Sequence, residues 1–82
     1  MKTNFSLHKR EYETWAECVQ RYGKPFHLDE DVLESFEVYT SSGMREDIAA
    51  FHACYDWDVL PTSPQYKQRL KHLIKNIFKA IV

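Results

Sequence analysis

The sequence predicts an all-α fold, a small bundle of about four short helices in a single helical domain over residues 1–82. Apolar residues recur at helical spacing in several segments, most regularly in 63–82. The two glycines and three prolines stand between these segments or near their first residues. Hydrophobic residues make up 44% of the chain and aromatic residues 15%, which is enough for one modest core and argues against disorder.

The first helix is expected over residues 7–22, with Ser6 as its N-cap. Gly23 suits the left-handed position that often follows a helix, and Pro25 stands where a helix cannot continue. The apolar stripe of this helix consists of Tyr12, Trp15, Ala16, Val19 and Tyr22. Its opposite side, which we expect to be solvated, carries Glu11, Glu13 and Glu17.

The second helix is expected to begin at Asp29, because acidic residues favour the positive end of a helix dipole. It should end before a turn at residues 40–43. Its helically spaced apolar residues are Val32, Leu33, Phe36 and Tyr39. Residues 36–40 are rich in β-formers, so the alternative is an α+β fold with a short sheet around residues 34–40.

Two further helices are expected in the second half of the chain. Ser42 can cap the third, which should end near Tyr55 or Trp57. The fourth opens with Ser63 and Pro64, because proline is tolerated at the first helical position. Its apolar face is expected to close the core and consists of Tyr66, Leu70, Leu73, Ile74, Ile77, Phe78 and Ile81.

Charge is segregated along the chain, although the net charge is only −1. Residues 1–10 hold three basic residues, residues 11–60 hold all twelve acidic residues against three basic ones, and residues 61–82 hold five basic residues and no acid. Such segregation indicates either that the ends fold back onto the acidic middle or that the protein has two faces of opposite sign.

The acidic middle predicts a docking surface for a protein partner with a basic surface. Tyrosine and tryptophan commonly anchor such interfaces. The residues expected to form this partner-binding surface are Glu30, Asp31, Glu34, Glu37, Tyr39, Asp56, Trp57 and Asp58. The sequence therefore predicts a small, non-enzymatic regulator or inhibitor that works by binding another protein.

The alternative is a helix-turn-helix DNA-binding regulator that reads DNA with the basic C-terminal helix. Glutamine and arginine near the start of such a helix are the residue types that contact base edges. The residues expected to contact nucleic acid are Gln65, Lys67, Gln68, Arg69, Lys71 and Lys75. The connection at 56–63 is longer than the turn of that motif, and Asp56 and Asp58 would lie near phosphates. A third hypothesis places the cationic, amphipathic helix 63–82 on a membrane surface.

No catalytic residue, metal ligand or cofactor is predicted. His52 and Cys54 are two residues apart, so they point to different sides of a helix, and the metal-binding pattern Cys-x-x-Cys is missing from the sequence. Cys18 and Cys54 are expected to be small buried side chains in a reduced, cytoplasmic protein. No apolar run approaches the length of a membrane span. A homodimer is compatible with each of these functions.

Overall fold

The structure is a computed structural model that describes the backbone of residues 7–81 and the side chains of residues 7–75. Its elements, in chain order, are α1 (Trp15–Gly23), the short 3-10 helix η1 (Lys24–Phe26), α2 (Asp29–Ser41), α3 (Glu46–Asp56) and α4 (Tyr66–Ile81). The predicted all-α fold is confirmed, since residues 7–81 contain no strand. The sheet considered around residues 34–40 is wrong, because this segment lies within α2.

α1 begins later than expected, at Trp15 rather than Leu7. Thr14 caps it through a capping box, in which the Thr14 hydroxyl accepts from the Glu17 backbone N–H at 3.1 Å. The Glu17 carboxylate in turn accepts from the Thr14 backbone N–H at 2.8 Å. This reciprocal pair satisfies two helix-end donors, and it places the preceding residues outside the helix. The expected cap Ser6 lies outside the described residues.

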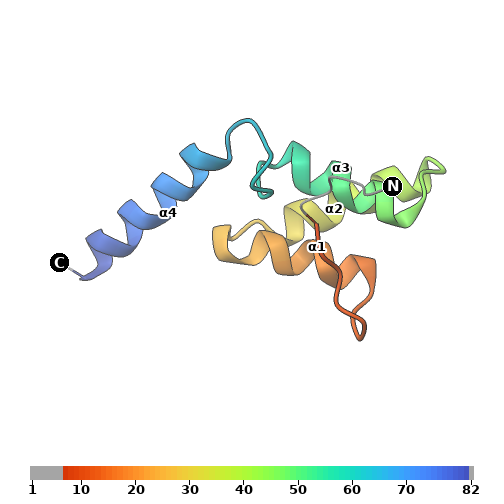
Figure 1. The fold of residues 1–82 in the computed structure, drawn as a ribbon, viewed down its shortest axis with the longest axis horizontal. Helices are drawn as coiled ribbons and strands as arrows, with labels where there is room; N and C mark the ends of the chain where they lie inside the picture. Colours follow the sequence, from red (N-terminus) through yellow and green to blue (C-terminus); the bar gives the residue numbers. More distant parts are fainter. Residues whose placement is uncertain (1–6, 82) are drawn as a thin grey trace.

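The segment before α1 packs back against that helix (Figure 1). Leu7 is buried, and the backbone N–H of His8 donates to the Tyr22 hydroxyl at 2.8 Å. Glu13, which we expected to be solvated, is also buried and forms an ion pair with Arg21 at 2.7 Å. An acidic residue is tolerated there because the guanidinium satisfies its carboxylate.

Gly23 ends α1 for a different reason than expected. Its φ is −82°, an ordinary right-handed value, and the left-handed residue of this connection is His27 with φ 59°. Glycine is required because a Cβ at this position would lie 2.8 Å from the Leu28 carbonyl oxygen. The close approach allows the Leu28 N–H to donate to the Gly23 carbonyl at 2.9 Å, and α2 follows directly at Asp29, as predicted.

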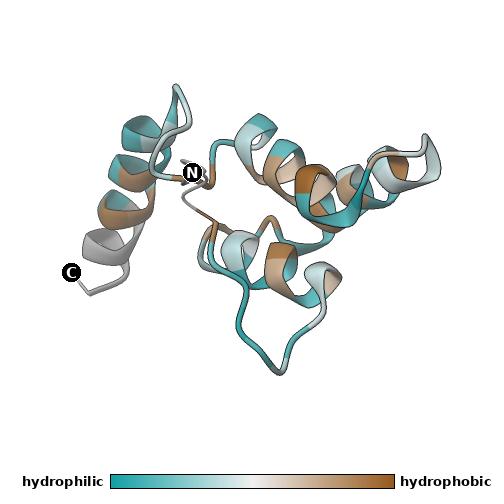
Figure 2. Cartoon of the chain, turned by 45° about the vertical axis from the view of Figure 1, so that its right-hand side comes forward, coloured by the Kyte–Doolittle hydropathy of each residue, from teal (hydrophilic) through white to brown (hydrophobic). Residues whose placement is uncertain are grey.

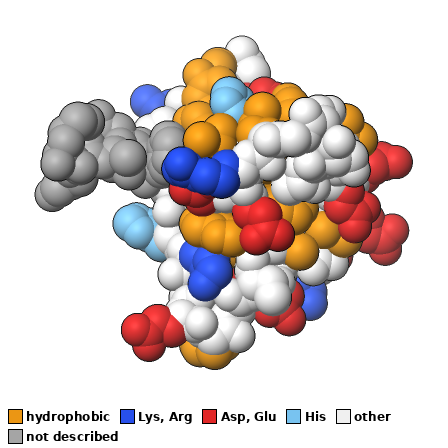
Figure 3. Space-filling view, turned by 90° about the vertical axis from the view of Figure 1, so that its right-hand side faces the viewer, with side chains coloured by type: hydrophobic (Ala, Val, Ile, Leu, Met, Phe, Trp, Pro, Cys, Tyr) orange, Lys and Arg blue, Asp and Glu red, His pale blue; other side chains and the backbone are white. Residues whose placement is uncertain are grey.

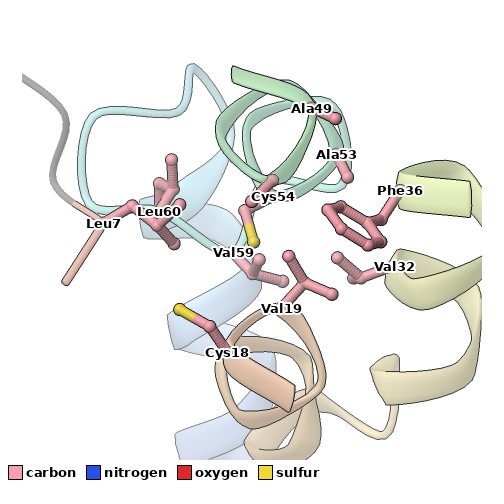
Figure 4. Packing of buried hydrophobic residues seen from close by; sticks show 11 residues of the cluster. Leu7, Cys18, Val19, Val32, Phe36, Ala49, Ala53, Cys54, Val59 and Leu60 are labelled. Carbon is pink, nitrogen blue, oxygen red and sulfur yellow. The ribbon is translucent and has the colours of Figure 1, made fainter. Parts of the chain in front are cut away.

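The core lies between α1, α2 and α3 (Figure 4). Apart from Phe36 it is built from small and medium side chains, and Cys18 and Cys54 are both free and buried, as predicted. Alanines on α3 allow its backbone to approach the other helices closely. The buried hydrophobic residues are Leu7, Cys18, Val19, Val32, Phe36, Ala49, Ala50, Ala53, Cys54, Val59 and Leu60.

α4 does not close this core, contrary to expectation. It begins at Tyr66, two residues beyond the predicted first helical residue, and runs away from the three packed helices (Figure 1). Val59 and Leu60, in the connection after α3, are 2% and 0% exposed and complete this core instead. With the core filled by the connection, the described part of α4 touches the body mainly through η1.

None of the helices in residues 7–81 combines the length and the apolar composition that a membrane crossing requires.

Candidate partner-binding surface

The acidic side chains of α2 gather on its outward face. Glu30, Glu34 and Glu37 are exposed, and their spacing of four and three residues places them along one side of the helix. With Asp31 and Leu33 they line a shallow hollow of about 440 Å³. We call this set of five residues the acidic face. It combines four carboxylates with one half-buried aliphatic side chain.

A second hollow of about 280 Å³ adjoins the acidic face through their shared residue Glu34. Its other lining residues are Ser35, Val38 and Tyr39. Val38, near the end of α2, is 60% exposed and so presents an apolar side chain to solvent. Figure 3 views the end of the molecule where α2 and α3 are joined, and acidic side chains lie there among apolar ones. The surface therefore offers apolar contact area beside its charge.

Two side-chain hydrogen bonds join α2 to the end of α3. The Tyr39 hydroxyl donates to the carboxylate of Asp56, and this bond raises the pKa of Tyr39. The Trp57 indole N–H donates to the Ser35 hydroxyl at 2.8 Å. Both aromatic side chains also pack against the core, so each is only partly open to a partner.

Asp58 is set apart from the acidic face by a structural role. It adopts a left-handed backbone conformation with φ 58°, and its carboxylate accepts from the Gln65 backbone N–H at 3.1 Å. Aspartate tolerates this conformation better than most residues. The carboxylate is thereby engaged in fixing the connection to α4.

Seven of the eight residues predicted for partner binding therefore lie on one connected surface of α2 and the end of α3. The sequence prediction omitted Leu33, Ser35 and Val38, which line the same hollows. A signal for Val38 was present, because it lies four residues after Glu34 and so shares the acidic side of the helix. Ser35 could not be found this way, since its role depends on Trp57, 22 residues later.

The carboxylates of the acidic face have no cationic partner within the described part of the chain. The ion pairs recorded there join Arg21 to Glu13 and Arg45 to Asp47, both at other places. Like charges three or four residues apart on a helix repel by roughly 0.2–0.5 kcal/mol per pair. A cationic partner would relieve this repulsion.

The basic residues of α4 are likewise unpaired among the side chains of residues 7–75. Lys67, Gln68, Lys71 and Lys75 are exposed, as is Gln65 before the helix. Arg69 is half-buried, and its Nε is shielded from solvent with no hydrogen-bond partner. These side chains form one cationic surface, which the protein's own acids leave unneutralised by ion pairing.

This cationic surface does not belong to a compact helix-turn-helix. The connection from Trp57 to Gln65 is longer than the three or four residues usual in that motif. α3 and α4 share no extensive packing over their described residues.

The described residues give little support for metal binding or thiol chemistry. These contain no group of three or more His, Cys, Asp or Glu side chains placed to hold a metal ion. Burial raises the pKa of the Cys18 thiol to about 11 and that of Cys54 to about 12, so both stay protonated at neutral pH.

The comparisons with known proteins add no relative, since no family model, curated protein or solved structure matches the chain.

Proposed function

We propose that this protein is a small, non-enzymatic regulator or inhibitor that binds a protein partner with a basic surface. The contact surface consists of the acidic face of α2, the adjoining Val38 and the exposed part of Tyr39. A basic site on a larger protein, bound and blocked by this face, is the kind of target that the proposal implies.

One observation carries this proposal: four carboxylates without a cationic partner lie beside Leu33 and the exposed Val38. The carboxylates supply electrostatic attraction and specificity. The apolar side chains supply area that loses water on binding, which charge alone does not provide. An acidic surface that served solubility alone would not need the exposed Val38 beside it.

Binding, rather than chemistry, is also favoured by the state of the two thiols. Cys18 and Cys54 are buried and protonated at neutral pH, so neither is available as a nucleophile. We further propose a cytoplasmic location, because the two thiols are unpaired, as is usual in reducing compartments.

A capture experiment tests the proposal. The protein is immobilised, and bound proteins from a lysate are identified by mass spectrometry at about 0.1 M and about 0.5 M salt. The variant Glu34→Lys/Glu37→Lys reverses the charge at the centre of the acidic face. We expect it to lose the specifically captured proteins at the lower salt concentration, and the wild type to lose them at the higher one.

The matched control is Glu11→Lys/Glu46→Lys, which makes the same charge change at exposed residues away from α2. It should retain capture. Equal loss in both variants would mean that net charge alone governs binding, and retention in the α2 variant would exclude the acidic face as the contact surface.

The second candidate function is nucleic-acid binding through α4. The observation that favours it is the exposure of Lys67, Lys71 and Lys75 on a helix that stands away from the body. Such a helix could follow a phosphate backbone without help from a helix-turn-helix.

Fluorescence anisotropy with a short labelled duplex tests this second candidate at low salt. Lys71→Glu should weaken binding several-fold and reduce its salt dependence, because one phosphate contact is lost. Lys24→Glu, an equal change on η1, should have a smaller effect. Equal effects of the two variants, or no binding by the wild type, would rule out nucleic-acid binding through α4.

A further inference from the structure

Over residues 66–75, the apolar face of α4 is only partly covered beyond its first turn. Tyr66 makes an edge-on contact with Phe26, with ring centroids 6.2 Å apart. Leu70 and Leu73 are only half-buried, and Ile74 is 47% exposed. Figure 2 shows hydrophobic positions along a helix, α4, that stands apart from the other three. A regular apolar face on a 16-residue helix is stable in water only when another surface covers it.

α2 and α4 are complementary in charge. α2 carries five acidic residues and no basic one, and α4 carries five basic residues and no acidic one. In the part of the chain with described side chains, neither helix forms an ion pair. Each helix therefore has the charge that the other lacks.

The two helices also match in apolar content and in length. On α2, the exposed Val38 and the half-buried Leu33 flank the acids. On α4, Lys67 and Lys71 border the apolar residues Leu70 and Ile74. With 13 and 16 residues the helices are about 20 and 24 Å long, so they can pair over roughly three turns.

Over the described residues, α4 does not pack along α2 of the same chain. The start of α4 is held by the bond from Gln65 N–H to Asp58 and by the contact of Tyr66 with Phe26. The Ser63 hydroxyl donates to the Tyr55 carbonyl at 3.1 Å and fixes the connection further. From this anchored start the helix points away from the body (Figure 1).

We propose that two copies of this chain associate reciprocally, with α4 of each copy lying along the acidic face and Val38 of the other. A two-fold axis makes both contacts at once, so a single pairing covers both apolar faces. The inference rests on the proposed function in that it concerns the same face of α2. In this dimer α4 of the second copy occupies the acidic face, and a basic protein partner must displace it to bind.

Charge exchange between the two helices tests the pairing. The α2 variant is Glu34→Lys/Glu37→Lys, and the α4 variant is Lys71→Glu/Lys75→Glu. Sedimentation equilibrium over a concentration series should show a wild-type dimer at about 0.1 M salt that dissociates at about 0.5 M. Each variant alone should dimerise more than about tenfold more weakly, because both of its contacts then bring like charges together at the altered positions.

An equimolar mixture of the two variants should restore a dimer. In the mixed dimer one contact joins the two altered helices and the other joins the two natural ones, so both have opposite charges. Native mass spectrometry identifies this species by its heterodimer mass. The control Glu11→Lys/Glu46→Lys should dimerise as the wild type does, and circular dichroism verifies that each variant keeps its helices.

Several results would overturn the pairing: a wild type that stays monomeric throughout the series, a dimer that neither variant weakens, or a mixture that does not recover. The proposed function fails separately. A monomer whose protein capture still depends on Glu34 and Glu37 would refute only the reciprocal dimer. A charge-exchangeable dimer whose α2 variant still captures the same proteins would refute only the regulator that binds through α2.

Discussion

The Glu13 carboxylate connects the segment before α1 to that helix through hydrogen bonds and an ion pair. It accepts from Arg21 Nε at 3.1 Å, from Arg21 Nη2 at 2.7 Å and from the Arg10 backbone N–H at 2.9 Å. The hydrogen bonds from Arg21, with that from Arg10, lower the pKa of Glu13 from 4.5 to about 2. The Arg21 guanidinium also donates to the His8 carbonyl at 2.6 Å, so the ion pair orders the whole segment.

Glu13→Gln should lower the stability of the protein at neutral pH and should remove part of its acid sensitivity. Because the pKa of Glu13 is depressed on folding, its ionised form stabilises the native state above about pH 4.5, and this contribution is lost as the pH falls towards 2. We expect the urea midpoint of the variant to be lower than that of the wild type at pH 7. The two midpoints should converge at about pH 2.

Glu11→Gln is the matched control, since Glu11 is exposed two residues away. Its urea midpoint should follow the wild type at each pH. A constant gap between Glu13→Gln and the wild type from pH 7 to 2 would show that the carboxylate acts through packing rather than through its charge.

Gly23 offers a second prediction for a single residue. Gly23→Ala should destabilise the protein by about 1–3 kcal/mol, because the new Cβ must push the Leu28 backbone away. Gly43→Ala meets nothing within 4 Å but has φ +100°, so its cost should be conformational and on the order of 1 kcal/mol. Urea unfolding of both variants gives the comparison, and a neutral Gly23→Ala would contradict the close approach of the backbone.

Sequence reasoning identified Gly23 as a helix terminator but could not give the reason. Both a left-handed end and a close backbone approach call for glycine, and they differ only in three dimensions. Glu13 was missed for a related cause. Its partner Arg21 is eight residues away, across a bend that the sequence pattern presented as continuous helix.

Among the helices, α1 depends most clearly on its cap. Thr14→Ala removes the side-chain half of the capping box and leaves the Glu17 N–H without its partner. We expect a loss of about 1 kcal/mol in the free energy of unfolding. Thr40→Ala is the control, because the Thr40 hydroxyl only bonds back to the Glu37 carbonyl of its own helix.

The control should change the free energy of unfolding by less than about 0.5 kcal/mol, since alanine is the better helix former. Equal losses in the two variants would mean that the capping box does not fix the start of α1. Amide hydrogen exchange in the first turn of α1 gives an independent measurement, and Thr14→Ala should speed exchange there alone.

Helix existence could be predicted from the sequence, and helix ends only in part. α2 and α3 follow from their spacing, and the β-formers of residues 36–40 were overruled because Phe36 packs into the core from a helix. The pattern Thr14-x-x-Glu17 held the true start of α1, but it competed with apolar spacing that continued upstream to Tyr12. Tyr12 proves to be 81% exposed and outside the helix.

At the scale of the whole molecule, the sequence could not predict that α4 lies outside the core. Its apolar face is as regular as any in the chain, and a regular face normally indicates the core. Hydrophobic spacing does not reveal that Val59 and Leu60, rather than the apolar face of α4, would be buried in the core. For the same reason the acidic residues of α2 could be identified as candidates from the sequence, but their lack of internal cationic partners could not.

A chain that ends at Gln65 should therefore still fold. Deleting residues 66–82 removes the contact between Tyr66 and Phe26, but none of the buried core residues found among the described side chains. We expect cooperative urea unfolding and a loss of only about 1 kcal/mol. Leu60→Ala in the full chain removes one fully buried side chain and should cost about 2–5 kcal/mol, more than the whole deletion.

The three forms are compared at low micromolar concentration and about 0.5 M salt, where pairing between α2 and α4 of different copies is screened. Under these conditions the order of stability should be wild type, truncated chain, then Leu60→Ala. A truncated chain that unfolds, or that is less stable than Leu60→Ala, would mean that α4 covers the core in solution. Its lysines would then lie close enough to the acidic face to neutralise it, and the carboxylates of α2 would no longer be free to bind a partner.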